Sequence, residues 1–425
     1  MHLTRRDILK GMGAAGVMGA CGVLPIPGLR GLVFGANNAG AILVVLHLRG
    51  GCDGLNLISP ATDPDFIAAR VSDLRVNAEG PDAGYALANG PAHDIDFRLH
   101  ASAGGLAELY QNGNLAFIHA CGLTNATRSH FVATDMIERG VASDADLARM
   151  TSGWLTRALK SNQSLSNSVQ AVSANGAISG DLNEFGSVMA IPDLNGDLAP
   201  AGGPAIGNTL RQLYADPSNE VAVAGRMAID LMGDIDARIP RDAQGHVQGY
   251  QPGAGAVYDT AAEFARPLKT VAQLIKMNMG LEVATLDLDG WDTHEGQPGR
   301  FKNNVQRLSD GLTAFWNDLS AYHNQLTVVT VTEFGRRLRS NKSNGTDHGR
   351  AGVMAVLGGN VKGGRCYGRW PGLKTEQLEE GVDLAVTTDY RQVLSEVLDF
   401  RNGSAKGNVW FPNFKMVERL NLFGR

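Results

Sequence analysis

The stretch AILVVLHLRGGCDGLN, residues 41–56, contains the pattern on which the fold prediction rests. Residues 41–48 are almost all apolar, and a short apolar run bounded by turn residues is typical of a strand buried on both faces. Glycines follow, and they let the backbone turn sharply and approach a ligand. We therefore expect a central strand that places Asp53 at the edge of a sheet.

Similar apolar runs recur along the chain, and helical patterns lie between several of them. Beyond the first strand, the predicted strands cover residues 114–120, 168–172, 281–288, 326–331 and 353–357. Helical patterns cover residues 102–111, 130–139, 302–322 and 389–400. Alternating strands and helices are typical of α/β proteins, so we predict a largely parallel central sheet with helices on both faces.

Residues 175–280 break this alternation. The segment begins rich in Gly, Pro and Asn and then shows helical patterns at 209–231 and 259–279. We interpret it as a mostly helical insertion, or a cap, on an α/β core formed by residues 37–174 and 281–425.

Residues 1–36 have the features of an export signal. Arg5 and Arg6 precede a Gly/Ala-rich apolar stretch, a layout typical of a twin-arginine signal peptide. That stretch is shorter than the ~20 apolar residues of a membrane-spanning helix. We predict the twin-arginine translocase as a partner during export, a periplasmic or secreted location, and no transmembrane helix after signal removal. Cleavage falls either near residue 36 or before Cys21, which would then carry a lipid anchor.

Composition excludes two classes of protein. The formal net charge is −5 and the pI is near 6.1, so the chain lacks the basic character of a nucleic-acid-binding protein. Four cysteines, one of them in the signal, are too few for a disulfide scaffold. Cys52 and Cys121 both follow predicted strands, which is compatible with a disulfide or with two buried thiols.

Polar residues follow the predicted strands, where ligands of open α/β sheets bind. Asp53 follows the first strand, either as a ligand or as a turn residue. Ser129 stands at the start of a predicted helix, where free amides and the helix dipole stabilise anions. It is either a nucleophile or an N-cap. Arg128 and His130 flank it.

Two later loops carry carboxylates and an imidazole. Asp292 and His294 follow the strand at 281–288, and this pair of side chains suits Zn, Mn or Fe. Glu333 follows the strand at 326–331 as a possible ligand. Arg336 either clamps an anion or pairs with Glu333. Turn chemistry is the alternative for Asp292.

A second Asp/His set, Asp347 and His348, precedes the strand at 353–357, unless it is only a polar turn. All these groups are expected at the carboxyl edge of one sheet, where carboxylates repel each other unless a cation neutralises them. We therefore predict a site for one or two divalent ions, Zn, Mn or Ca. The predicted ligands are Asp53, Asp292, His294, Glu333, Asp347 and His348.

Five motifs together resemble an exported bacterial family described as domain of unknown function 1501. They are RGGCDGLN at 49–56, RSHF at 128–131, GWDTH at 290–294, TEFGR at 332–336 and GTDHG at 345–349. That family is similar to the alkaline phosphatase/sulfatase superfamily. The resemblance implies an alkaline phosphatase-like fold, the predicted metal ligands, and Ser129 as nucleophile. It leaves Asp347 as a ligand or as the residue that orients His348.

The chain also departs from the superfamily pattern. Asp292 and His294 are closer in sequence than is usual, and Phe334 stands where a His ligand normally follows a strand. The protein then binds one metal ion, binds two in a different way, or is a degenerate relative. The Cys-x-Pro-x-Arg signature of formylglycine sulfatases is absent, which disfavours that mechanism.

The expected activity is hydrolysis of phosphate or sulfate esters, with an anionic ester, small or polymeric, as substrate. Ser129 would attack with help from a metal ion, while Arg128, Arg336 or a second cation would neutralise the transferred group. One alternative is a non-catalytic binding protein at the cell surface or in the periplasm. Another is a metal-free hydrolase with His130 or His348 as the base. A dinucleotide enzyme is disfavoured because the glycine fingerprint is missing.

Overall fold

The computed structural model describes residues 41–161, 169–194, 203–216, 218–258, 264–403 and 405–424. The predicted signal at residues 1–36 and the possible lipid anchor at Cys21 lie outside these ranges. Within them, no helix combines the length and the apolar character that crossing a membrane requires.

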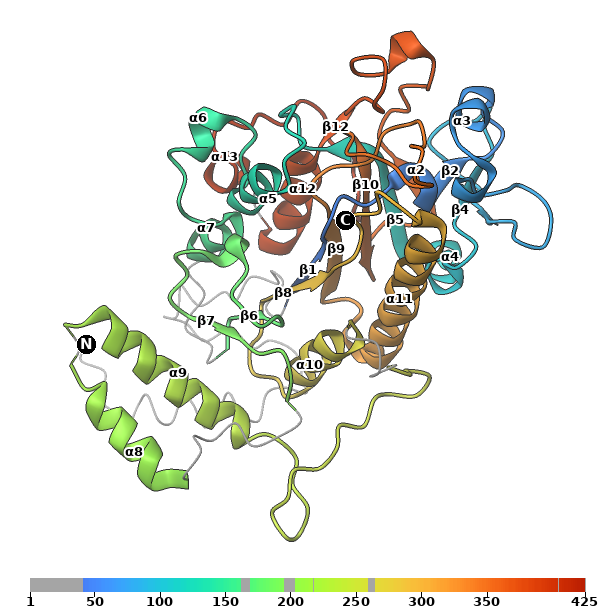
Figure 1. Ribbon diagram of the computed structural model, residues 1–425. Helices are drawn as coiled ribbons and strands as arrows, with labels where there is room; N and C mark the ends of the chain where they lie inside the picture. Colours follow the sequence, from blue (N-terminus) through green and yellow to red (C-terminus); the bar gives the residue numbers. More distant parts are fainter. Residues whose placement is uncertain are drawn as a thin grey trace, which may run out of the picture. The chain divides into compact units, whose positions relative to one another are not determined.

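A mixed sheet forms the centre of the fold (Figure 1). Its strand order is β11-β5-β10-β9-β1-β8-β6-β7, with β12 beside β5. The strands are β1 (Ile42–Leu48), β5 (Leu115–Gly122), β6 (Ala171–Ser173), β7 (Val188–Ala190), β8 (Val283–Leu288), β9 (Leu326–Val331), β10 (Gly352–Gly358), β11 (Arg365–Tyr367) and β12 (Thr388–Asp389). The central β1 is buried along its whole length and pairs in parallel with β8 and β9. The predicted mostly parallel sheet is confirmed.

One strand runs against the others. β10 is antiparallel to both β9 and β5, because residues 332–351 turn back at the carboxyl edge of β9. Residues that precede β10 therefore lie at the same edge as residues that follow β1, β8 and β9. This reversal places His348 beside the loops that carry the other predicted site residues.

Helices cover both faces of the sheet (Figure 1). One face carries α4 (Gly104–Gln111), α10 (Ala265–Lys276) and α11 (Gln297–Asp318), and the other carries α5 (His130–Arg139), α7 (Trp154–Ser161) and α12 (Tyr390–Asn402). Side chains alternate across a strand, so Val44 and Leu46 of β1 join the first core while Leu43 and Val45 join the second. The two apolar cores explain why β1 has no polar face.

Smaller elements surround the sheet, and most were not predicted. A three-stranded antiparallel sheet is formed by β2 (Ile58–Pro60), β4 (Phe97–Leu99) and β3 (Tyr85–Ala86). The short helices are α2 (Gly54–Leu57), α3 (Pro64–Ala69), α6 (Asp144–Leu147), α13 (Gly407–Trp410) and the 3-10 turns η1 (Ser72–Leu74), η2 (Gly180–Leu182), η3 (Ser320–Tyr322) and η4 (Thr375–Gln377).

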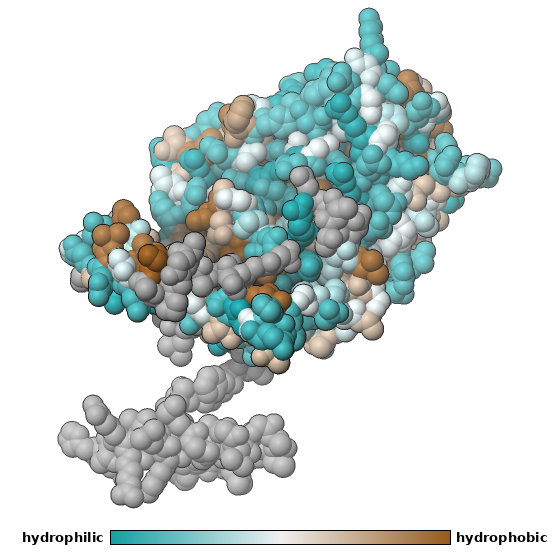
Figure 2. Space-filling model, turned by 60° about the horizontal axis from the view of Figure 1, so that its bottom comes forward, coloured by the Kyte–Doolittle hydropathy of each residue, from teal (hydrophilic) through white to brown (hydrophobic). Residues whose placement is uncertain are grey.

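The segment 175–280 contributes one strand, β7, to the sheet and then becomes helical. The single helical pattern predicted at 209–231 is wrong, because two helices, α8 (Gly203–Leu213) and α9 (Glu220–Asp236), occupy this region. Asp216 accepts the backbone N–H of Ser218 between them, and the side chain of Asn219 caps α9. Apolar side chains on this helical pair are exposed, including Leu213 and Val221 (Figure 2). Its role as a cap stays a prediction.

The cysteines Cys52 and Cys121 are both buried and free. Burial raises the pKa of both thiols well above their usual range. Of the two alternatives, two buried thiols are what the structure contains.

Candidate metal centre

The loop after β1 is held in place by Glu333. Its carboxylate accepts the backbone N–H of Gly50 at 2.9 and 3.0 Å and that of Gly51 at 2.9 Å. Burial tends to raise the pKa of Glu333, but the nearby imidazole of His130 and the hydrogen bonds from these amides outweigh burial and lower it to about 2. Glu333 is therefore an ionised anchor for the glycine loop, which replaces the predicted role of metal ligand.

The two glycines allow this close approach. Gly50 and Gly51 have φ angles of +116° and +75°, which disfavour residues with a side chain. A Cβ at Gly50 would lie 2.4 Å from the backbone nitrogen of Asp292, and one at Gly51 would lie 2.5 Å from a ring carbon of Phe334. The glycine loop and the Asp292 loop therefore touch through their backbones.

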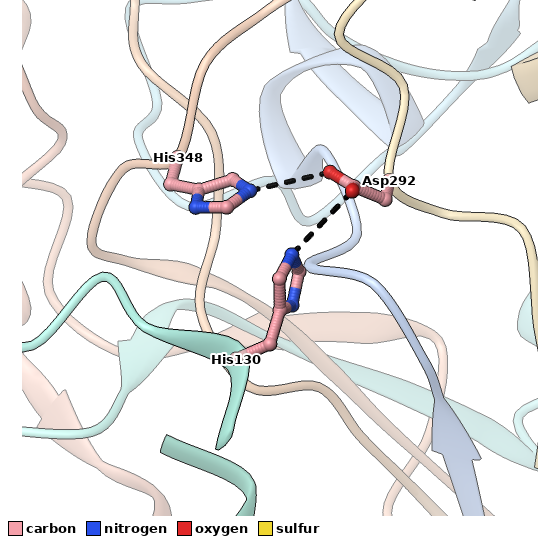
Figure 3. A group of neighbouring side chains, drawn as sticks. All are labelled: His130, Asp292 and His348. Atoms are coloured by element: carbon pink, nitrogen blue, oxygen red, sulfur yellow. Dashed lines mark hydrogen bonds and ion pairs between the residues drawn. The ribbon is translucent and has the colours of Figure 1, made fainter. Parts of the chain in front are cut away.

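The imidazoles of His130 and His348 converge on the carboxylate of Asp292 (Figure 3), and a third imidazole, of His294, lies beside them. His130 begins α5, Asp292 and His294 follow β8, and His348 precedes β10. Nε2 of His348 lies 2.8 Å from Nε2 of His294 and 3.2 Å from Oδ1 of Asp292. Nε2 of His294 lies 3.1 Å from the same oxygen. Nε2 of His130 lies 3.5 Å from Oδ2 of Asp292.

The outer nitrogens of two imidazoles bind acceptors. Nδ1 of His348 lies 2.9 Å from the carbonyl oxygen of Arg128, and Nδ1 of His294 lies 3.0 Å from Oδ1 of Asp347. Neither acceptor carries a proton, so each Nδ1 must donate. In the neutral rings, both Nε2 atoms then present lone pairs toward each other and toward Asp292. This arrangement is what metal-binding histidines adopt, with the outer N–H held by a carboxylate or a carbonyl.

His130 completes the cluster from the opposite side. Its Nδ1 lies 3.7 Å from Oε1 of Glu333, while its Nε2 is buried and has no hydrogen-bond partner in the described part of the chain. The nearby carboxylate of Glu333 raises the pKa of His130, and Asp292 adds to that effect. In the absence of a metal ion, a proton on His130 would provide part of the positive charge that the cluster requires. Burial, by contrast, lowers the pKa of His348.

Phe334 supports the imidazoles of His130 and His348. Its ring is buried, with its centroid 4.9 Å from that of His130 and 4.6 Å from that of His348. The aromatic contact limits rotation of both rings. Asp292 and His294 lie on the other side and are 47% and 42% exposed in their side chains, so the cluster is open to solvent.

Asp53 does not belong to this cluster, which corrects its predicted role as a ligand. Its buried carboxylate forms two hydrogen bonds with Arg70, of 2.6 and 3.0 Å, and accepts another from Gln297 at 2.7 Å. It also caps α2. Burial tends to raise the pKa of Asp53, but the guanidinium of Arg70 outweighs burial and lowers it. Arg70 supplies the positive charge that the sequence interpretation assigned to a metal ion.

The predicted role of Arg336 as an anion clamp is also corrected. Its guanidinium is 1% exposed and donates to the carbonyl oxygens of Gly50, Gly51, Trp291 and Thr346. It also donates to Oδ1 of Asp292 at 2.6 Å. Burial tends to raise the pKa of Asp292, but this bond outweighs burial and lowers it. Arg336 therefore ties three loops together and orients Asp292, and its guanidinium is not available to a substrate.

Arg128 and Asp347 act on the histidines from outside. The guanidinium of Arg128 pairs with Asp383 at 2.5 Å and Glu380 at 2.9 Å, so it lacks the free charge that a substrate clamp requires. Its carbonyl oxygen, instead, holds His348. Asp347 holds His294 rather than His348.

Ser129 occupies the N-cap position of α5, as the helix prediction requires, but its side chain makes no capping hydrogen bond. The residue is exposed. It stands between Arg128, whose carbonyl binds His348, and His130 of the cluster. The hydroxyl is therefore free at a helix start that is fixed to two of the three histidines.

The sequence predicts His130 as a neighbour of Ser129 or as a base, and the place of His130 in the cluster was not predicted. The signal was present in the RSHF motif, because a residue that begins a helix after a central strand reaches the same edge as the other loops.

Comparisons with known proteins provide a partial match to a family model but no activity. Residues 202–406 match the model of a family described as protein of unknown function DUF1501. No match is found among the curated proteins. Among solved structures, the chain is similar to the crystal structure of the C-terminal periplasmic domain of EcEptC from Escherichia coli in complex with Zn. That similarity has 9% identity, covers 75% of this chain and 73% of that chain, and gives a TM-score of 0.34.

A protein from Pyrococcus horikoshii, PH0037, is similar over 75% of this chain and 86% of that chain, with 11% identity and a TM-score of 0.27. The predicted kinship with the alkaline phosphatase superfamily stays a prediction. The match to the DUF1501 model covers residues 202–406, just under half of the chain.

Proposed function

We propose that the protein is an exported hydrolase of phosphate or sulfate esters that depends on one metal ion bound by His130, His294, His348 and Asp292. The observation that carries this proposal is the convergence of Nε2 of His294, Nε2 of His348 and Oδ1 of Asp292, which lie 2.8–3.2 Å apart. Nε2 of His130 approaches the other oxygen of Asp292 at 3.5 Å. A tetrahedral zinc site with bonds of about 2.0 Å has ligand atoms about 3.3 Å apart. The atoms of His294, His348 and Asp292 therefore have nearly the spacing that a small divalent ion requires, with His130 as the fourth proposed ligand.

The donor set favours a particular ion. Three imidazole nitrogens and one carboxylate oxygen suit Zn²⁺ better than Ca²⁺, which prefers oxygen ligands. Mn²⁺ is the second candidate. A single ion is favoured over two because Asp53 is neutralised by Arg70 and Glu333 is bound by backbone amides. The exposed side of Asp292 leaves an open position for substrate, as a catalytic site requires.

Ser129 is the proposed nucleophile. A bound divalent ion would supply Lewis-acid chemistry and lower the pKa of a nearby hydroxyl or water. The Ser129 Oγ would form a bond to phosphorus or sulfur while the ester oxygen leaves as the alcohol, and water would then release the acid and restore Ser129. The free amides at the start of α5 favour the negative charge that develops there. Arg128 and Arg336 act by holding His348 and Asp292.

Metal analysis tests the proposal. Elemental mass spectrometry on protein purified without affinity metal should find stoichiometric Zn or Mn in the wild type. His294→Ala/His348→Ala should lose the metal, while His246→Ala, which alters an exposed histidine far along the chain in the α9–α10 connection, should keep it. A wild type that stays free of metal after Zn and Mn are offered would overturn the metal site.

Metal retained without hydrolysis of any phosphate or sulfate ester would favour the alternative of a non-catalytic binding protein. Export through the twin-arginine route is part of the proposal and rests on Arg5 and Arg6. It predicts that replacing both arginines with lysine keeps the protein in the cytoplasm.

A further inference from the structure

A cavity of about 980 Å³ is lined in part by the loop that leads to the candidate metal centre. Its wall is formed by residues 174–177 after β6, by the start of α10, by residues 287–290 after β8, and by Asn304 and Arg307 of α11. A space of this size accommodates a polar ligand of moderate size. We call it the arginine cavity, because Arg266 of α10 and Arg307 of α11 both line it.

The arginine cavity is close to the metal centre along the backbone. Gly290 lines the cavity, and Asp292, two residues later, belongs to the metal cluster. Two residues of extended chain span at most about 7 Å. A short molecule could therefore contact both places at once.

Arg266 and Arg307 are the cationic groups of the cavity wall. Both are exposed, and neither forms a hydrogen bond or ion pair within the described ranges. The wall also holds three aspartates: Asp287 pairs with Arg49 at 3.0 Å, and Asp193 and Asp289 each have an interaction partner. The two guanidinium groups are therefore available to an anionic ligand.

Helix packing brings the two arginines to the same wall. α10 and α11 are in close contact at Gly311, where a Cβ would lie 2.7 Å from Phe264 and 2.9 Å from the side chain of Leu268. Arg266 of α10 lines the cavity next to this contact. Arg307 precedes Gly311 by four residues, so it lies on the same side of α11. An anion in the cavity could accept charge-assisted hydrogen bonds from both guanidinium groups.

We infer that the arginine cavity binds a second anionic group of the substrate, so the preferred ester carries at least two anionic groups. One group would bind at the metal centre and the other at Arg266 and Arg307. The inference rests on the proposed function for the reacting group, but the binding of an anion by the two arginines stands independently of any metal ion. The guanidinium fork matches phosphate, sulfate and carboxylate groups.

Calorimetry with two probes tests this inference. Butanediol bisphosphate should bind the Zn-loaded wild type at least about tenfold more tightly than butyl phosphate, because only the bisphosphate reaches both sites. Arg266→Gln/Arg307→Gln should remove that advantage. The matched control is Lys269→Gln/Lys302→Gln, which makes the same change of charge on the same two helices outside the cavity wall. Thermal melts should be unchanged in both variants, because the arginines are exposed.

The advantage should persist in the control. If it also persists in Arg266→Gln/Arg307→Gln, or falls equally in the control, the inference is wrong. The variant His294→Ala/His348→Ala separates the two proposals. In the His294→Ala/His348→Ala variant, butyl phosphate should lose its metal-dependent binding. Replacing Arg266 and Arg307 in that same variant should still weaken the binding of the bisphosphate. If replacing Arg266 and Arg307 leaves the affinity for the bisphosphate unchanged in that variant, the anion site is wrong whether or not the protein binds a metal ion.

Discussion

Nε2 of His294 lies 2.8 Å from Nε2 of His348, although the two residues are 54 positions apart in the chain. Nδ1 of each imidazole donates a hydrogen bond to a different acceptor. His294 donates to Asp347, and His348 donates to the carbonyl oxygen of Arg128. Two lone pairs at this distance repel each other unless a cation lies between them. This relationship is the basis of the predictions on metal binding.

Metal removal should lower thermal stability. A ligand that binds only the folded state stabilises it by about 2.7 kcal/mol at a free concentration of 100 times its Kd. Adding excess Zn to chelator-treated wild type should therefore raise Tm, and His130→Ala should lose most of that increase. His246→Ala should respond like the wild type. An equal increase of Tm in His130→Ala would exclude His130 as a ligand.

Asp347→Asn should weaken metal binding without removing a ligand. Asp347 orients His294 through Nδ1, and loss of such a partner typically costs about 10- to 100-fold in metal affinity. Competition with a chromophoric chelator measures the change. Asp310→Asn, at an exposed carboxylate on α11 that accepts from Gln306, is the control and should leave affinity unchanged. A normal affinity in Asp347→Asn would show that the hydrogen bond has no role in metal binding.

Glu333→Gln should destabilise the protein in a way that depends on pH. The pKa of Glu333 is lowered from an ordinary 4.5 to about 2, so its stabilising effect is present above pH 4.5 and is lost as pH falls toward 2. A shift of that size corresponds to about 3 kcal/mol. Urea unfolding should show this difference from the wild type near neutral pH and a smaller one near about pH 3. A gap that stays constant with pH would contradict the assignment.

Gly51→Ala should destabilise the loop after β1. The residue has a φ of +75°, and an added Cβ would collide with the ring of Phe334, which itself packs on His130 and His348. The backbone strain alone costs about 1–3 kcal/mol. Chemical denaturation measures the loss. Gly186→Ala is the control, because a Cβ there meets no atom within 4 Å. Equal stability of the two variants would show that the close approach is absent in solution.

Ser129→Ala should abolish ester hydrolysis and leave metal content intact, because Ser129 carries the proposed nucleophile and is not one of the four ligands. Turnover of aryl phosphate and aryl sulfate esters is the first readout, and elemental analysis is the second. Ser218→Ala, in the exposed turn between α8 and α9, should keep full activity. Undiminished turnover in Ser129→Ala would mean that another group attacks the ester.

Much of the fold could be predicted from the sequence because its signals are local. The strand at 326–331 and the helix at 130–139 have the bounds expected from apolar runs and helical spacing. The sequence also predicted that Asp292, His294 and His348 lie close together, since loops at strand ends meet at one edge, and the structure shows this proximity. Their role as metal ligands stays a prediction. Other features depend on contacts between residues distant in the chain, so short sequence patterns could not predict them. They are the order of the strands, the small sheet and the split of 209–231 into two helices.

What the sequence by itself determined is the position of each polar residue relative to the strands and helices, because apolar run length and periodicity act over a few residues. Only the tertiary structure decided which of those residues are available to a ligand. Asp53 and Glu333 looked like metal ligands, but Arg70 neutralises the first and the Gly50 and Gly51 amides bind the second. His130 joined the cluster instead. The partner of a buried charge is chosen by residues distant in the chain, and that choice arises only when the strands assemble.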